Sequence, residues 1–215
     1  MKDKYKVCSL FAGIGGIDLA FKQSGFEVVW ANEFDKDACK TYRHNFPDIL
    51  LSECDIRKVN AKDIPDFDMC NKFQFPKEQP LKKHIFDIID RSVKADDSFY
   101  LNENSVQYQK MNAAITDENQ IYRFSDYGIQ KSKDGISFTL KANMGTWYNR
   151  VPIIKDNFGI RTITPQECLA LQGFPKSFDF PDIPIKSMYK QCGNTVVVPV
   201  VKDIIRELVR FTNDN

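Results

Sequence analysis

The stretch Cys-Ser-Leu-Phe-Ala-Gly-Ile-Gly-Gly-Ile-Asp-Leu-Ala-Phe, residues 8–21, decides the fold. Its apolar start predicts a buried strand, its glycines a tight turn, and its end an amphipathic helix. In such a turn Gly13 and Gly15 let the backbone approach a ligand closely, while the helix that begins near Gly16 directs free N–H groups at it. The stretch is therefore typical of a nucleotide-binding turn, although Asp18 stands where a dinucleotide fingerprint has its third glycine.

Strand and helix patterns alternate around this turn. Working outward, we expect a strand over 5–11, a short helix over 17–22, a strand over 26–31, a helix from Asp35 to about His44, and short strands at 49–51 and from Phe67. This alternation predicts an α/β fold with a parallel, doubly wound sheet.

The regular pattern stops at Cys70. Residues 71–156 are polar and irregular, with one plausible helix near 85–93. Order returns at Thr164, which with Glu167 forms the pattern of a capping box, and a last amphipathic helix begins near Pro199. We therefore divide the chain into 1–69, the first part of an α/β domain, 70–156, a separate small domain or an extended insert, and 157–215, where the chain returns to the first domain.

Composition excludes several classes of protein. The chain has 215 residues, of which 42% are hydrophobic and 27% charged, and no apolar run approaches the ~20 residues that cross a bilayer. Glycines interrupt the apolar part of the N-terminal stretch, which argues against a signal peptide. Six cysteines without a CxxC pair, and only two histidines, predict no metal site and reduced thiols in a cytoplasm. The net charge of +1 does not by itself indicate nucleic-acid binding.

Two acids extend the nucleotide-binding pattern. Glu33 lies about 20 residues after Gly13, just past the second strand, where an acid accepts hydrogen bonds from ribose hydroxyls. Asp55 follows the expected third strand and could accept a hydrogen bond from an adenine amino group. A glycine-rich turn with two surface acids is the alternative, but acids at successive strand ends favour a nucleoside site.

Separated motifs resemble the DNA cytosine-5 methyltransferases, in particular bacterial type II modification methylases. Phe-Ala-Gly-Ile-Gly-Gly at 11–16, Asn-Glu-Phe-Asp at 32–35 and Asp-Ile at 55–56 resemble the first three motifs of that family. Residues 161–175 resemble its ninth motif, and Gln-Cys-Gly-Asn-Thr-Val at 191–196 its tenth. Matches in family order at both ends of the chain make a dehydrogenase a weaker interpretation, and the absence of Asn-Pro-Pro-Tyr or Asp-Pro-Pro-Tyr disfavours an amino-methyltransferase.

The resemblance implies an internally truncated, Rossmann-like methyltransferase sheet, formed by 1–69 and 157–215, that binds S-adenosyl-L-methionine. It makes 70–156 the remnant of a small target-recognition region and implies action on double-stranded DNA. It places Glu33 at the ribose, Phe34 against the adenine and Asp55 at the adenine edge. Its full set of cofactor residues is Phe11, Gly13, Ile14, Gly16, Glu33, Phe34, Asp55, Ile56, Asn194 and Val196. Its DNA-binding set is Thr139, Asn143, Arg150 and Arg161, of which the family uses the arginine at 161 to brace the DNA-reading region. A polar loop without a ligand explains the first three equally well.

The central motifs that carry the family's catalytic residues are missing from this chain. The family adds a cysteine thiolate to C6 of a flipped cytosine, with the thiol from a Pro-Cys-Gln loop and an assisting acid from a Glu-Asn-Val segment, and neither tripeptide occurs in this chain. Cys70 lacks the preceding proline and following glutamine, so we interpret it as a thiol at a deletion junction and assign no catalytic residue. We expect an internally truncated relative that is inactive alone. A subunit of a split enzyme, completed by a second polypeptide, or a non-catalytic module that binds S-adenosyl-L-methionine or DNA, are the alternatives.

Overall fold

The computed structural model describes residues 4–68, 75–80, 82–133, 135–145 and 150–213. The chain forms two compact units, each built from segments that are distant in sequence. The first unit consists of Met1–Gln79, Gln172–Ile183 and Thr195–Asn215, and the second of Pro80–Leu171 and Pro184–Asn194. Cys70, the predicted junction thiol, lies outside the described residues.

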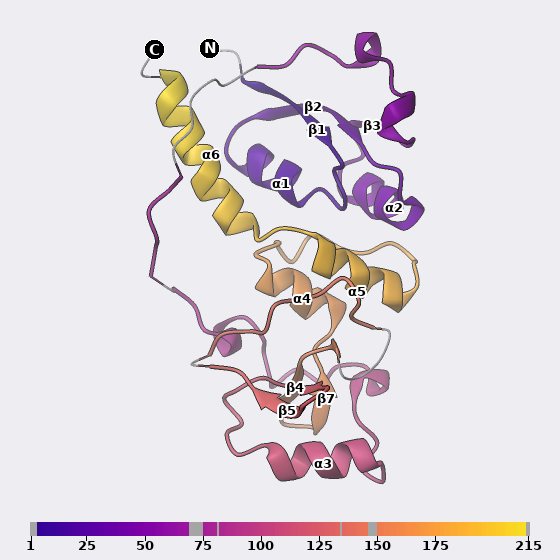
Figure 1. Ribbon diagram of the computed structural model, residues 1–215, viewed down its shortest axis with the longest axis vertical. Helices are drawn as coiled ribbons and strands as arrows, with labels where there is room; N and C mark the ends of the chain where they lie inside the picture. The colour runs from indigo at the N-terminus through magenta and orange to yellow at the C-terminus, as the bar shows by residue number, and fades with distance from the viewer. Residues whose placement is uncertain (1–3, 69–74, 81, 134, 146–149, 214–215) are drawn as a thin grey trace. The chain divides into compact units, whose positions relative to one another are not determined.

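A parallel three-stranded sheet forms the centre of the first unit. Its strands are β1 (Lys6–Leu10), β2 (Glu27–Asn32) and β3 (Leu50–Ser52), in the order β1-β2-β3 (Figure 1). The α/β fold with parallel strands that the sequence predicts is confirmed. Leu10 pairs with Asn32, which pairs with Ser52, so the three carboxyl ends lie level at one edge of the sheet.

Helices connect and cover these strands. They are α1 (Gly16–Gln23), α2 (Lys36–Asn45) and α6 (Val198–Asn213), with two 3-10 turns, η1 (Ile56–Lys58) and η2 (Ala61–Asp63), after β3. The predicted cap of α2 is confirmed, because the Asp35 side chain accepts hydrogen bonds from the N–H groups of Asp37 and Ala38. Helices α1 and α6 pack on each other, with Ile205 of α6 fully buried (Figure 1).

The second unit contains an antiparallel sheet that sequence reasoning did not anticipate. Its strands are β4 (Tyr122–Ser125), β5 (Gly128–Lys131), β6 (Ile153–Lys155) and β7 (Ile160–Thr162), in the order β5-β4-β6-β7, and helix α3 (Val106–Ala114) belongs to the same unit. The buried side chains that form its core are Leu101, Met111, Tyr122, Ile153 and Ile160. The polar segment that was expected to be irregular therefore has a hydrophobic core.

The prediction of a helix near 85–93 is wrong. Only a 3-10 turn, η3 (Ile85–Asp87), forms there, and a second, η4 (Asp97–Phe99), follows. The side chain of Asp90 accepts hydrogen bonds from both the N–H and the hydroxyl of Ser92. Such a local side-chain bond favours a turn over a continuing helix.

Two helices complete the second unit, α4 (Pro165–Leu171) and α5 (Ile185–Asn194). The capping box before α4 is confirmed: the Glu167 N–H donates to Thr164 Oγ1 at 3.1 Å, and the Thr164 N–H donates to the Glu167 carboxylate at 2.7 Å. The Tyr189 hydroxyl of α5 donates to the Ile163 carbonyl at 2.6 Å, which ties α5 to the start of α4.

Candidate functional site

The level strand ends of the first unit collect the predicted cofactor groups at one edge of the sheet. Phe11 and Glu33 directly follow the paired residues Leu10 and Asn32. Asn32 is buried, and its side-chain amide donates to the carbonyls of Ser52 at 3.0 Å and of Cys54 at 2.9 Å. These bonds fix the loop that leads to Asp55, a positioning role that the sequence motif alone did not reveal.

The glycine turn closes directly onto Glu33. Gly13 has φ of 58°, a left-handed conformation that favours glycine, and its N–H donates to Glu33 Oε2 at 2.8 Å. A Cβ on Gly16 would lie 2.4 Å from Thr195 Oγ1 and 3.2 Å from Val196 Cγ2. The structure thus brings Val196, from the far end of the chain, to the start of α1, and only glycine fits at position 16.

Backbone donors hold the Glu33 carboxylate in place. Oε1 accepts hydrogen bonds from the N–H groups of Phe34 and Asp35, both at 2.8 Å, and Oε2 accepts the one from Gly13. Each carboxylate oxygen has two lone pairs. Oε2 therefore retains capacity for one further donor, such as a ribose hydroxyl.

Two phenyl rings stand exposed beside this carboxylate. Phe11 is 65% exposed and Phe34 is 69% exposed. Phe11 also has φ of 55°, the one non-glycine residue with positive φ among the described residues. Such a conformation costs roughly 1–2 kcal/mol and is retained where a side chain must be presented in a particular direction. Exposed aromatic faces of this kind suit stacking on a purine or contact with a sulfonium cation.

The remaining predicted cofactor residues differ in their burial and in their partners. The side chain of Ile14 is buried, so only its backbone can face a ligand. The Asp55 carboxylate caps η1 and binds the Arg57 guanidinium, which lowers the pKa of Asp55. Since the Arg57 side chain is mostly exposed, this pair is weak and can yield to a ligand. Asn194 ends α5 in the second unit, so its role in the pocket stays a prediction.

Asp18 is a buried acid under the same turn. It is fully buried, and neither of its carboxylate oxygens has a hydrogen bond of ordinary geometry. Burial raises the pKa of Asp18 to about 6, and the hydroxyls of Ser9 and Tyr42 and the ammonium of Lys22 offset part of the rise. In the sequence, Asp18 differs from the dinucleotide fingerprint only by replacing its third glycine, and nothing there indicates that the carboxyl is buried.

Three of the four predicted DNA-binding side chains are exposed in the second unit, namely Thr139, Asn143 and Arg150. Asn143 and Arg150 line a cavity of about 380 Å³ beside the β4–β5 hairpin. Its complete lining is Arg123, Phe124, Ser125, Asp126, Tyr127, Gln130, Lys141, Asn143 and Arg150. We call it the hairpin groove. Tyr127, at the tip of the hairpin, is 97% exposed, and sequence reasoning missed it.

Arg161 occupies a different environment from the other three. It is 1% exposed, its Nε donates to Asp156 Oδ2 at 2.5 Å, and both Nη atoms donate to Glu167 at 2.7 and 2.8 Å. The guanidinium is therefore inaccessible to DNA in this structure, which corrects its place among direct contacts. Instead it joins β7 to the first turn of α4, as a brace would.

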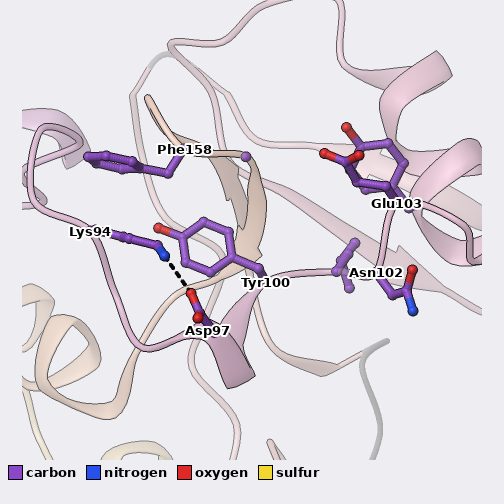
Figure 2. Close-up of a pocket in the computed structure, with 9 residues that line it drawn as sticks. Lys94, Asp97, Tyr100, Asn102, Glu103 and Phe158 are labelled. Carbon is purple, nitrogen blue, oxygen red and sulfur yellow. Dashed lines mark ion pairs between the residues drawn. The ribbon is translucent and has the colours of Figure 1, made fainter.

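A second cavity in this unit, of about 410 Å³, differs in charge (Figure 2). Lys94 forms an ion pair with Asp97 at 2.7 Å on one side, and Glu103 lies on the other. Two acids against one paired lysine disfavour a phosphate ligand. The hairpin groove, with three basic side chains and one acid, is the better candidate for DNA.

No helix among the described residues is long and apolar enough to span a membrane.

Comparison with known proteins agrees with this arrangement of motifs. The family model described as C-5 cytosine-specific DNA methylase matches residues 5–71 and 69–210. Type II methyltransferase M.Bsp6I of Bacillus sp. (strain RFL6) is 29% identical over 311 residues, covering 95% of this chain and 98% of that protein. M.SsoII of Shigella sonnei is 24% identical over 315 residues, covering 96% of this chain and 80% of that protein.

Solved structures give the same fold. The S. pombe Dnmt2 methyltransferase superposes with a TM-score of 0.71 at 15% identity, covering 98% of this chain and all of that one. The Dnmt2 of Spodoptera frugiperda gives a TM-score of 0.68 at 16% identity. Because the family model matches most of the sequence, the chain belongs to the C-5 cytosine-specific DNA methylase family, whose members use S-adenosyl-L-methionine.

Proposed function

We propose that this chain binds S-adenosyl-L-methionine at the sheet edge of its first unit and DNA at the hairpin groove, and that it does not transfer a methyl group alone. The observation that carries the proposal is the Glu33 carboxylate, held by Gly13 and by its own following backbone with one lone pair to spare. The family acts on double-stranded DNA, and this chain retains the parts that bind rather than the parts that react.

The groups at the sheet edge fit the cofactor. Glu33 Oε2 would accept one ribose hydroxyl, and the exposed rings of Phe11 and Phe34 would contact the adenine and the sulfonium. The Asp55 carboxylate would accept a hydrogen bond from the adenine amino group after releasing Arg57. When bound, S-adenosyl-L-methionine supplies an electrophilic methyl group; the chain's own residues bind and orient it.

Four of the five described cysteines are poor substitutes for the missing nucleophile. Methylation at C5 needs a thiolate that adds to C6 of the cytosine, and burial disfavours the thiolate. Cys168 and Cys192 are fully buried. Burial, with nearby acids, raises the pKa of Cys39 to about 12, and burial also raises the pKa of Cys8. These thiols support the expectation that the chain is inactive alone.

The hairpin groove supports the DNA contact. Lys141 and Arg150 can neutralise phosphates, whereas Arg123 is fixed by a 2.9 Å bond to Gln130 and by stacking on Phe138. Tyr127 projects beside these cations and offers a flat face to a base. Phosphate contacts of this kind set affinity and position, and polar or aromatic groups beside them read sequence.

Calorimetric titration with S-adenosyl-L-methionine and a methyl-transfer assay with tritiated cofactor test the proposal together. We expect saturable cofactor binding by the purified chain and no label in duplex DNA. Label transferred by the chain alone would overturn the claim of inactivity, and an absence of cofactor binding would overturn the pocket. If the chain binds the cofactor or DNA but shows no methyl transfer even after a second polypeptide is added, a non-catalytic binding module is favoured over a subunit of a split enzyme.

A further inference from the structure

Asp18 is a buried acid that stability alone does not explain. It lies in the first turn of α1, two residues after Gly16, and its side chain is fully buried. Neither carboxylate oxygen has a hydrogen-bond partner of ordinary geometry, and the same is true of the buried Tyr42 hydroxyl. A buried acid without such a partner destabilises a folded protein at any pH where it is ionised. Its position under the glycine turn indicates a role in the cofactor site instead.

Few groups act on this carboxyl. Ser9 of β1 and Tyr42 of α2 contribute hydroxyls, and Lys22 lies one turn further along α1. The Lys22 ammonium also lies 5.3 Å from the centre of the Phe46 ring. Helix α1 packs on β2 and α6 as well, but no charged group of these two elements in the described part of the chain acts on the carboxyl. Because burial raises the pKa of Asp18 to about 6 against these weak opposing groups, an added cation would shift the carboxyl toward its ionised form.

The methyl donor and its product differ by one positive charge. S-adenosyl-L-methionine carries a sulfonium, whereas S-adenosyl-L-homocysteine, which remains after methyl transfer, has a neutral sulfur. Solvent and salt screen a buried carboxylate poorly, so its attraction for a cation reaches further than that of a surface acid. The proposed function places the cofactor along the glycine turn, and Gly13 and Gly16 of that turn lie in the same segment as Asp18. An ionised Asp18 would therefore favour the donor over the product.

We propose that Asp18 is a specificity-determining residue, whose ionised carboxyl makes the cofactor site select S-adenosyl-L-methionine over S-adenosyl-L-homocysteine. The inference rests on the proposed function, because it requires the cofactor to bind at the sheet edge. By linkage, a cation that attracts the carboxylate also favours its ionisation, so binding of the donor near pH 6 releases more protons than binding of the product. The selectivity decreases as pH falls and Asp18 becomes protonated.

Calorimetric titration of the full chain with each molecule, at pH 5 and at pH 7.5, measures this selectivity. The informative quantity is the Kd of S-adenosyl-L-homocysteine divided by the Kd of S-adenosyl-L-methionine. We expect this ratio to be roughly tenfold larger at pH 7.5 than at pH 5, as for two charges that interact through a protein interior. Titrations at pH 6 in two buffers of different ionisation enthalpy count the protons released, which should be more numerous for the donor.

Three variants identify the group responsible. Asp18→Asn removes the charge and keeps the shape, so the ratio should become equal at the two pH values and the difference in proton release should vanish. Tyr42→Phe keeps the ring, whose centre lies 4.8 Å from that of Phe46, but removes a hydroxyl that favours the carboxylate, so the rise in selectivity should move to higher pH. Asp48→Asn, at an exposed acid of the same unit, is the matched control and should leave the parent's profile unchanged.

Two results would overturn this inference while leaving the proposed pocket intact. They are a ratio that does not change with pH in the parent chain, and a pH-dependent ratio that persists in Asp18→Asn. If neither molecule binds at either pH, the proposed pocket is wrong and this inference fails with it. Circular dichroism of each variant shows whether it is folded.

Discussion

Replacing Asp18 with asparagine should stabilise the protein above pH 6. Asp18 is fully buried beneath the glycine turn, and burial raises its pKa from 3.8 to about 6. In the window between these two values the folded state retains a proton that the unfolded state has lost. The stability contributed by the protonated carboxyl is therefore complete below pH 3.8 and decreases as pH rises to about 6, above which the buried carboxylate is a constant cost.

The size of this cost follows from the shift. A rise of roughly 2 pH units corresponds to about 3 kcal/mol, at 1.36 kcal/mol per unit. Asparagine has nearly the same shape and no charge, and its amide can use the hydroxyls of Ser9 and Tyr42, which act on Asp18. We expect Asp18→Asn to raise the free energy of unfolding at pH 8 by about 1–3 kcal/mol, and to change it little at pH 4.

Thermal unfolding followed by circular dichroism at pH 4, 5, 6, 7 and 8 measures the effect. The informative quantity is the difference in melting temperature between variant and parent, which should grow through the window and reach about 3–10 °C at pH 8. Asp48→Asn, at an exposed acid of the same unit, is the control and should show no such growth. A difference that is constant with pH, or a variant less stable than its parent at pH 8, would refute the reasoning.

Three further predictions concern the site and its support. Glu33→Gln should weaken S-adenosyl-L-methionine binding at least about tenfold by calorimetry, because an amide presents a donor where backbone N–H groups already point. Glu27→Gln, at an exposed acid, is the control and should leave this affinity unchanged. Arg161→Met should lower the free energy of unfolding by about 3–5 kcal/mol, because it leaves its two acidic partners without a cation, and a loss under 1 kcal/mol in denaturant titration would contradict the bracing role. Arg150→Gln should weaken binding to duplex DNA and reduce the slope of log affinity against log salt by about 1, which titrations at several salt concentrations measure.

The first unit was predictable because its determinants are local. The glycine turn, the alternation of apolar strands with amphipathic helices, and the Asp35 cap each lie within a few residues of what they determine. The capping box at Thr164 is predictable for the same reason. Parallel pairing then follows from the β-α-β connection, which brings the strand ends to one edge.

The second unit was not predictable in this way. Its sheet forms from strands of only 3–4 residues, too short to show a period, and β4 pairs with β6 across a long stretch of chain. One signal was available: Gly128 follows Asp-Tyr between two short segments, and its φ of 108° is one that favours glycine. That pattern marks a hairpin turn and would have drawn attention to Tyr127 at its tip.

Burial was the property that sequence reasoning judged least well. The resemblance gave Arg161 a bracing role in the DNA-reading region, but nothing in the sequence indicated that Asp156 and Glu167 would enclose it. Both partners are close in sequence, at five residues before and six after, yet spacing alone cannot distinguish a surface pair from an ion pair that the fold encloses. Only the pairing of β6 with β7 and the start of α4 bring both acids to the guanidinium.

The cofactor edge can persist without the catalytic stretch because its bonds run only between neighbouring strands. Gly13 donates to Glu33, and Asn32 holds the carbonyl of Cys54, so each step joins one strand end to the next. None of these bonds involves the part of the chain that the family match interrupts at 69–71. On the proposed function, loss of that stretch removes the nucleophile, while the groups that would hold the methyl donor keep their geometry.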